Sequence, residues 1–196
     1  MMTRMRMLAS TVAAVAVVIV VTGARAWSVP LGGPSTLPAP GPREVLIIRT
    51  AEEPKGSDVH LSEEGKVRAK ALATWIPATY GKPTALFASH ATDKSKRAAE
   101  TLSPIAGVLR LKVQDQFAND DYAKLAEKLL KESEFEGKTI LICWTKGNIA
   151  NLAKALGARQ TPAWPDGQYD HVWRLQFGAR GVTLEDVVQK LPSPGK

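Results

Sequence analysis

The 196-residue sequence has one cysteine, Cys143, and only three histidines. A single cysteine excludes an intramolecular disulfide. Cys143 lies within the apolar run 139–144, where we expect a buried small side chain and not a catalytic thiol, because no neighbouring histidine would lower its pKa. The histidines are scattered, without the cysteine or carboxylate spacing of a metal site, so the sequence predicts neither a bound metal nor a cofactor.

The chain also lacks a run of basic residues with aromatic residues between them. Its lysines and arginines are spread along predicted helices, where solvated helix faces account for them, so we expect no nucleic-acid partner. Hydrophobic residues make up 44% of the chain and charged residues 23%, values typical of a soluble globular domain. No internal repeat is present.

Residues 1–26 have the features of a signal peptide. Two arginines precede the uncharged apolar stretch 7–21, and a small-x-small pattern follows at 24–26. We therefore expect cleavage after Ala26 and a secreted or periplasmic protein. The alternative is that segment 7–21 stays uncleaved and tethers the protein to the membrane, although it is shorter than the about 20 residues of a typical spanning helix.

The segment after the expected cleavage site, 27–42, reads as a linker. It contains five prolines and three glycines, a composition typical of a semi-extended tether. We expect the folded domain to occupy 43–196. Cleavage removes three arginines and no acidic residue, so the formal charge falls from +7 to +4, which is compatible with an anionic ligand.

Strand and helix patterns alternate within this domain. Apolar, β-branched runs predict buried strands, and apolar residues at helical spacing predict amphipathic helices. The predicted strands are 44–49, 84–89, 109–113, 138–144, 169–177 and 182–191, the last two as an edge hairpin, and the predicted helices are 62–77, 94–108, 121–135 and 147–156. The alternation predicts a three-layer α/β/α sandwich with a mostly parallel sheet.

Polar residues follow three of the predicted strands, at the carboxyl ends where open parallel sheets bind ligands. They are residues 49–52 after the first strand, Ser89 with Arg97 and Thr101 after the second, and residues 144–148 after the strand at 138–144. We expect these three segments to form one site.

Four segments resemble motifs of the histidine phosphatase (phosphoglycerate-mutase-like) superfamily, and they occur in that family's order. The segments IIRTAEEP and HLSEEGKVRAKALATWI resemble its opening, and FASHATDKSKRAAETLSPIA resembles its Ser…Arg-Ala-x-x-Thr segment. TILICWTKGNIANLAKALG resembles its strand-His-Gly-x-Ile-helix segment, and WPDGQYDHVWRLQF resembles its closing segment. The resemblance spans residues 44–178 and implies that family's fold.

The sequence departs from the family pattern at both catalytic histidines. In the family the first histidine attacks phosphorus and the second helps to bind the transferring group; this chain has Thr50 and Lys146 at those positions. A threonine hydroxyl is a weak nucleophile near neutral pH unless an adjacent base removes its proton. The resemblance therefore implies a catalytically impaired member.

The anion-binding half of the pattern is retained. Arg49 and Arg97 match the family's phosphate-clamping arginines, whose planar guanidinium groups hold two phosphate oxygens at once. Ser89 can donate a hydrogen bond, and Lys146 keeps a positive charge where the family has histidine. We expect these residues to bind a phosphorylated or other anionic small molecule.

Acidic residues leave two questions open. Glu52, Asp120 and Asp121 are candidate general acids, although Asp120 and Asp121 also fit an ordinary helix cap. The second question is whether Arg49 and Arg97 bind an anion or only form ion pairs with Glu52, Glu53 or Glu100.

Three functions remain open from the sequence. The first is an exported pseudophosphatase that binds an anionic ligand without turning it over. The second is an active phosphomonoesterase in which His90, or Thr50 helped by a neighbour, replaces the missing nucleophile. The third is a non-catalytic scaffold that contacts an envelope partner. His60 and His90 fall near the expected pocket rim, and we expect His171 to be structural.

Overall fold

The computed structural model describes residues 41–191, all within one compact unit, Thr36–Lys196. The predicted signal peptide, the apolar stretch 7–21 and nearly all of the predicted linker lie outside the described residues. The elements, in chain order, are β1 (Glu44–Arg49), α1 (Glu63–Tyr80), β2 (Ala85–Ser89), α2 (Arg97–Leu109), β3 (Val113–Phe117), the 3₁₀ turn η1 (Asn119–Asp121), α3 (Tyr122–Lys131), η2 (Ser133–Phe135), β4 (Thr139–Trp144), α4 (Lys146–Ala155), β5 (His171–Gly178) and β6 (Gly181–Val188).

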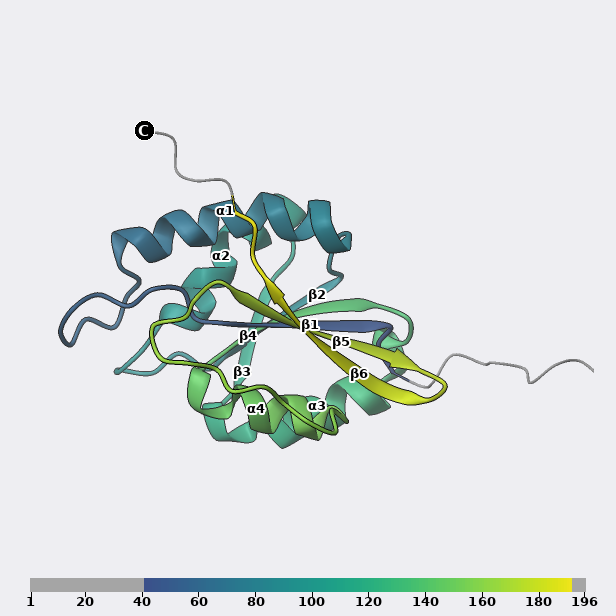
Figure 1. The fold of residues 1–196 in the computed structure, drawn as a ribbon. Coiled ribbons are helices and arrows are strands. Elements are labelled where there is room, and N and C mark those ends of the chain that lie inside the picture. Colours follow the sequence, from purple (N-terminus) through teal and green to yellow (C-terminus); the bar gives the residue numbers. More distant parts are fainter. Residues whose placement is uncertain (1–40, 192–196) are drawn as a thin grey trace, which may run out of the picture. The chain divides into compact units, whose positions relative to one another are not determined.

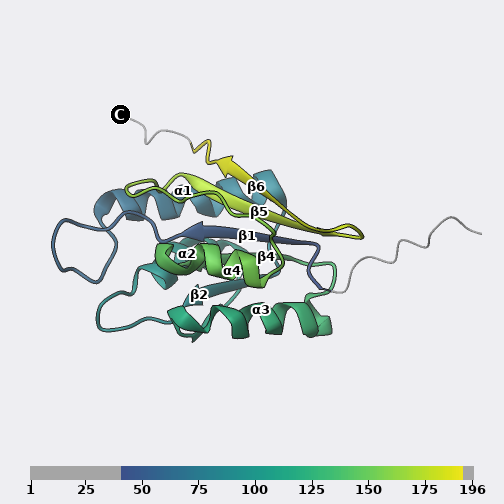
Figure 2. The same ribbon diagram turned by 60° about the horizontal axis from the view of Figure 1, so that its bottom comes forward.

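These elements form a six-stranded sheet in the order β3-β2-β4-β1-β5-β6, between two layers of helices (Figures 1 and 2). Strands β1 to β4 pair in parallel, whereas β5 and β6 are antiparallel and form the edge hairpin. Helices α1 and α2 cover one face of the sheet, and α3 and α4 cover the other (Figure 1). The predicted three-layer sandwich with a mostly parallel sheet is confirmed.

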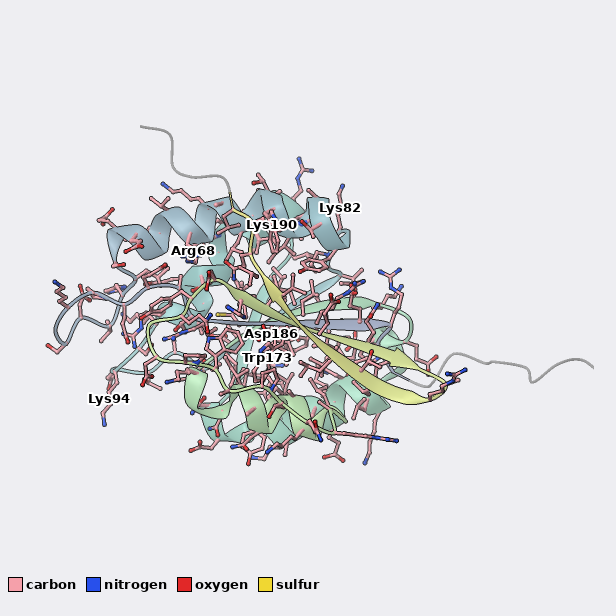
Figure 3. All side chains as sticks on the ribbon, in the orientation of Figure 1. Arg68, Lys82, Lys94, Trp173, Asp186 and Lys190 are labelled. Atoms are coloured by element: carbon pink, nitrogen blue, oxygen red, sulfur yellow. The ribbon has the colours of Figure 1, made fainter. Side chains whose placement is uncertain are left out.

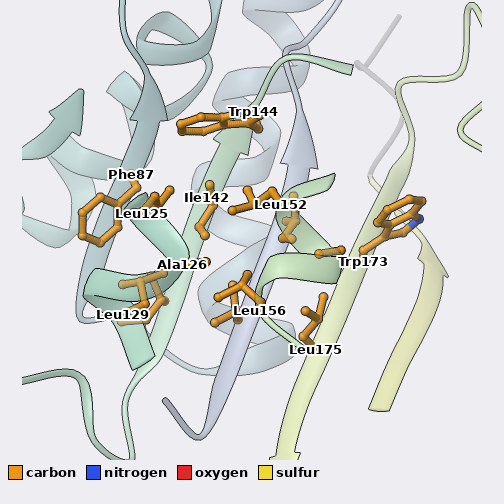
Figure 4. Close-up of a cluster of buried hydrophobic side chains, with 14 of the residues drawn as sticks. Phe87, Leu125, Ala126, Leu129, Ile142, Trp144, Leu152, Leu156, Trp173 and Leu175 are labelled. Atoms are coloured by element: carbon orange, nitrogen blue, oxygen red, sulfur yellow. The ribbon is translucent and has the colours of Figure 1, made fainter. Parts of the chain in front are cut away.

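The central strands are apolar along their whole length because both of their faces are covered. In β1, Leu46 and Ile48 join the core beneath α1 and α2, whereas Val45 and Ile47 join the core beneath α3 and α4. Figure 4 shows part of the second core, with Trp144 at the carboxyl end of β4. This two-sided burial holds the ends of β1 and β4 in fixed register, with Arg49 beside Trp144.

One strand prediction is wrong. The third strand was expected at 109–113, but α2 continues through Pro104 to Leu109 and β3 spans Val113–Phe117. Arg110 has a left-handed backbone (φ 55°) that ends α2, and Leu111 N donates to Ala106 O at 3.0 Å in the same turn. Leu109 and Leu111 pack against the core beside α2, so their apolar character reflects the end of a helix and not a strand.

Candidate anion-binding site

The carboxyl ends of three neighbouring parallel strands, β1, β4 and β2, bring the predicted site residues to one edge of the sheet. Arg49 pairs with Trp144 across β1 and β4, and Ala88 pairs with Cys143 across β2 and β4. The next residues along each strand are therefore neighbours. Ser89 Oγ lies 3.3 Å from Thr145 Oγ1, with either hydroxyl able to donate.

Arg49 is buried at this edge, with 7% of its surface exposed. Its Nη1 donates to the backbone oxygen of Gln168 at 3.2 Å, and its guanidinium stacks on the Tyr169 ring, 4.0 Å from the ring centroid. Within residues 41–191 its Nε has no hydrogen-bond partner. Burial lowers the pKa of Arg49, and the nearby Glu53 carboxylate opposes that shift.

Arg97, the first residue of α2, is held by the loop between β1 and α1. Its Nη2 lies 3.1 Å from Glu53 Oε2, and its Nη1 donates to Asp58 O at 3.2 Å. Its Nε is also buried without a partner in the described part of the chain. Arg97 is therefore held by the loop between β1 and α1, whereas Arg49 is held by Gln168 and Tyr169 of the loop before β5.

The two arginines differ in their ion pairs. Arg97 forms an ion pair with Glu53, but Arg49 forms none with Glu52, Glu53 or Glu100. Glu100 instead accepts from Leu61 N at 2.9 Å and pairs with His60. Of the two guanidinium groups, only that of Arg49 has no carboxylate partner among the described residues.

Thr50, which the sequence comparison predicted to replace the first histidine, is 8% exposed. The next residue, Ala51, donates its backbone N–H to Thr101 Oγ1 at 3.0 Å, and Thr101 in turn donates to Arg97 O at 2.7 Å. These two bonds tie the end of β1 to the first turn of α2. Thr101 was not among the predicted phosphate-binding residues, although its place in the Arg-Ala-x-x-Thr segment pointed to it.

Each of the three histidines has a polar partner other than Thr50. His60 contacts Glu100, and His90 Nδ1 lies 2.8 Å from Asp115 O. His171 Nδ1 lies 2.6 Å from Asp186 Oδ1, on the edge hairpin. Among the hydrogen bonds of residues 41–191, none joins the Thr50 hydroxyl to a histidine or a carboxylate, so the described contacts provide no base for it.

Lys146, which the sequence comparison predicted to replace the second histidine, begins α4 and forms an ion pair with Asp166 of the loop before β5. The loops after β1 and before β5 lie at the same end of the sheet (Figure 1), where Figure 3 labels Lys94. The loop before β5 therefore contacts the site twice: Gln168 and Tyr169 hold Arg49, and Asp166 holds Lys146.

The candidate general acids have structural contacts. Arg68 Nε donates to Glu52 Oε1 at 2.7 Å, and Arg68 Nη1 donates to Gln189 Oε1 at 3.2 Å. Asp120 accepts from Asn148 Nδ2 at 2.8 Å. Asp121 accepts from Ala118 N at 3.3 Å and pairs with Lys124, whose hydrogen bond lowers the pKa of Asp121.

Two further properties limit the chemistry. No three histidine, cysteine or acidic side chains of residues 41–191 are grouped so that they could hold a metal ion. Burial raises the pKa of the Cys143 thiol to about 12, so this side chain is neutral at physiological pH.

Within residues 41–191, no helix is long and apolar enough to cross a membrane.

Comparison with known proteins identifies the fold only. No family model matches the sequence, and no curated protein is significantly similar to it. Among solved structures, the chain resembles a mycobacterial glucosyl-3-phosphoglycerate phosphatase in complex with inorganic phosphate (TM-score 0.52, 16% identity, 75% of this chain and 96% of that one). It also resembles the protein histidine phosphatase SixA complexed with tungstate (TM-score 0.58, 14% identity, 74% and 96%) and a phosphoglycerate mutase from Bacillus anthracis (TM-score 0.53, 15% identity, 77% and 95%).

Proposed function

We propose that this protein is an exported pseudophosphatase. The proposal is based on the histidine phosphatase fold of its domain and on the residues at the ends of the strands. The protein binds a phosphorylated or other anionic small molecule through Arg49, Arg97, Ser89 and Lys146. It does not hydrolyse that ligand at the rate of an enzyme with a histidine nucleophile.

One observation carries the proposal: Arg49, which is buried, and Arg97, whose side chain is 17% exposed, each have a buried Nε–H with no partner in the described residues. Buried polar groups are normally hydrogen-bonded, so an unpaired one calls for an explanation. A phosphate oxygen is a suitable acceptor for each, because charged guanidinium–phosphate bonds are among the stronger hydrogen bonds in proteins. The phosphate and tungstate complexes of the two structural neighbours agree with an anionic ligand.

The residues at this edge of the sheet favour binding of a phosphate group over its hydrolysis. Phosphoryl transfer depends on positioning and on charge stabilisation, which the arginines supply. The covalent step also needs a nucleophile, and Thr50 aligns with that position while the three histidines have other partners. Loss of a catalytic unit leaves only the acceleration that derives from binding, so residual hydrolysis should be orders of magnitude slower.

Titration calorimetry with inorganic phosphate tests the binding claim. We expect Arg97→Ala and Arg49→Lys each to weaken phosphate binding at least tenfold, since the first removes a guanidinium and the second removes the bidentate fork. Arg180→Ala is the matched control, because Arg180 lies in the exposed turn between β5 and β6. Wild-type protein without measurable phosphate binding, or equal weakening by Arg180→Ala, would contradict the proposal.

Export has its own test, because segment 1–26 lies outside the described residues. We expect the protein recovered from the exported fraction to begin at Trp27, as N-terminal sequencing will determine. Recovery of full-length protein from the membrane fraction would instead support the anchored alternative.

A further inference from the structure

The backbone oxygen of Gln168 accepts two hydrogen bonds. One comes from Arg49 Nη1, at 3.2 Å, and the other comes from the indole Nε1 of Trp164, at 2.9 Å. A carbonyl oxygen has two lone pairs, so it can accept from both donors at once. Trp164 therefore shares its acceptor with a guanidinium of the candidate site.

This carbonyl is the polar contact that orients Arg49. Among the hydrogen bonds and ion pairs of residues 41–191, it is the one partner of that guanidinium, and the ring of Tyr169 stacks on the same group. An arginine binds an anion more tightly when its planar fork is already held in place, because less freedom is lost on binding. The affinity of the site should therefore depend on where the Gln168 carbonyl is held.

The position of the Gln168 carbonyl depends on side-chain contacts. Residues 160–170 form neither helix nor strand, so no backbone ladder holds this oxygen. The indole that donates to it is fixed: the Trp164 ring packs on Trp173 of β5, with centroids 5.0 Å apart. Trp173 is buried in the core beneath α3 and α4 (Figure 4). Trp164 thus connects the core of the domain to the acceptor of Arg49.

We propose that Trp164 is a positioning residue of the anion site: its indole N–H fixes the Gln168 carbonyl, and this carbonyl orients the Arg49 guanidinium toward the ligand. The inference rests on the proposed function, because it concerns the affinity of the same site for phosphate. Trp164 was not among the predicted phosphate-binding residues. It acts through Arg49 and does not itself hold the anion.

Calorimetry with inorganic phosphate is the first part of the test. Trp164→Phe keeps an aromatic ring beside Trp173 but removes the N–H donor. We expect the Kd for phosphate to rise about three- to tenfold, the range expected for loss of one hydrogen bond. Trp75→Phe is the matched control, because Trp75 packs on Tyr80 within α1 and the hydrogen bonds of residues 41–191 include none from its indole. It should leave the Kd unchanged.

The second part follows Arg49 itself in the ligand-free protein, by NMR hydrogen exchange of arginine Nε–H groups after ¹⁵N labelling. The Nε atoms of Arg49 and Arg97 are both buried without a partner in the described residues, and Arg49→Lys and Arg97→Ala assign their signals. Trp164→Phe should accelerate exchange at Arg49 about fivefold or more relative to Arg97, because Arg97 is held instead by Glu53 and Asp58 O. A general loss of stability accelerates exchange at both arginines equally.

An unchanged Kd in Trp164→Phe, or the same weakening in Trp75→Phe, overturns the inference while phosphate binding by the wild type stands. Equal acceleration of exchange at both arginines also overturns it, because Trp164 then acts only on the stability of the fold. If the wild type does not bind phosphate, the proposed function fails. Selective exchange at Arg49 then supports the positioning of this side chain alone, and its absence overturns the inference altogether.

Discussion

Gly65 and Ser62 fix the position of the loop that follows β1. Ser62 N and Ser62 Oγ both donate to Glu52 O, at 3.0 and 3.2 Å, and Ser62 Oγ accepts from Gly65 N at 3.1 Å as the N-cap of α1. A Cβ on Gly65 would lie 2.5 Å from Glu52 O. The glycine therefore permits the backbone contact that fixes the loop in which Glu52 pairs with Arg68 and Glu53 pairs with Arg97.

Substitution of this glycine should be costly. We expect Gly65→Ala to lower the free energy of unfolding by about 1–3 kcal/mol, because the new methyl group forces backbone atoms apart. It should also weaken phosphate binding, since the loop that positions Arg97 through Glu53 and Asp58 O has to move. Urea unfolding and phosphate calorimetry measure the two effects.

Gly107→Ala is the comparison for that variant. Gly107 is an exposed helical glycine in α2 whose added Cβ would have open space around it. Here alanine should stabilise the protein by about 0.5–1 kcal/mol, since glycine is the poorer helix former. If both variants have the same stability, the close approach at Gly65 has no energetic importance.

Cys143 links burial to the pH dependence of stability. Burial raises the pKa of its thiol from 9.0 to about 12. Above pH 9 the unfolded chain releases this proton more readily than the folded protein, so the folded state loses stability as pH rises. We expect the unfolding free energy of the wild type to fall relative to that of Cys143→Ala by about 1.4 kcal/mol per pH unit above pH 9.

Urea denaturation of both proteins between pH 7.5 and 10.5 measures this difference. The cavity left by alanine lowers the stability of the variant at every pH. The prediction therefore concerns how the difference in unfolding free energy between the two proteins changes with pH. A difference that stays constant across this range would mean that the thiol is accessible to solvent in the folded protein.

Residue identities pointed to the site, but not to its contacts. The positions of Arg49, Thr50 and Ser89 at strand ends follow from the strand pattern alone, because parallel strands end at the same edge. Their partners depend on the tertiary fold: Arg49 meets a backbone oxygen 119 residues away, at Gln168. Local patterns carry no information about such a contact.

At the scale of the elements, the loop before β5 contacts two of the proposed site residues, Arg49 and Lys146. Trp164 anchors it: the indole Nε1 donates to Gln168 O at 2.9 Å, and its ring packs on Trp173 of β5 with centroids 5.0 Å apart. From this anchor the loop holds Arg49 and Lys146. Its prolines identified it as a loop in the sequence, without indicating that it covers the site.

Asp166 of this loop competes with an anionic ligand. Its carboxylate pairs with Lys146, so phosphate has to displace it or share the ammonium. We expect Asp166→Asn to tighten phosphate binding about three- to tenfold at low ionic strength and less at high salt, because the interaction is screened. Calorimetry at two salt concentrations measures both effects.

Glu127→Gln provides the control, since Glu127 forms another exposed ion pair, with Lys131 on α3. It makes the same change in net charge on α3, a helix that carries none of the proposed site residues. Equal tightening in both variants would show a general effect of charge and no competition by Asp166.

The elements predicted best are those with two buried faces. β1 and β4 are continuous apolar runs, and their bounds in the structure match the prediction to within one residue. β3 was misplaced because it is a polar edge strand, Val-Gln-Asp-Gln-Phe, with few apolar residues to mark it. Its position depends on pairing with β2, which a local pattern does not specify.

At the scale of the whole molecule, the fold and the proposed chemistry are separate matters. The sheet order and the two helical layers bring cationic residues to one edge. The same architecture occurs in the phosphatases and the mutase that the chain resembles. A fold hosts many activities, so the function depends on the side chains at that edge.

The most direct test is the steady-state hydrolysis of p-nitrophenyl phosphate by the wild-type protein and by the double variant Thr50→His with Lys146→His. We predict negligible turnover by the wild type under conditions in which it binds phosphate, and a gain of turnover with a trapped phosphohistidine in the double variant. Rapid wild-type turnover that Arg49→Lys abolishes, with a phosphorylated residue on the protein, would contradict the account.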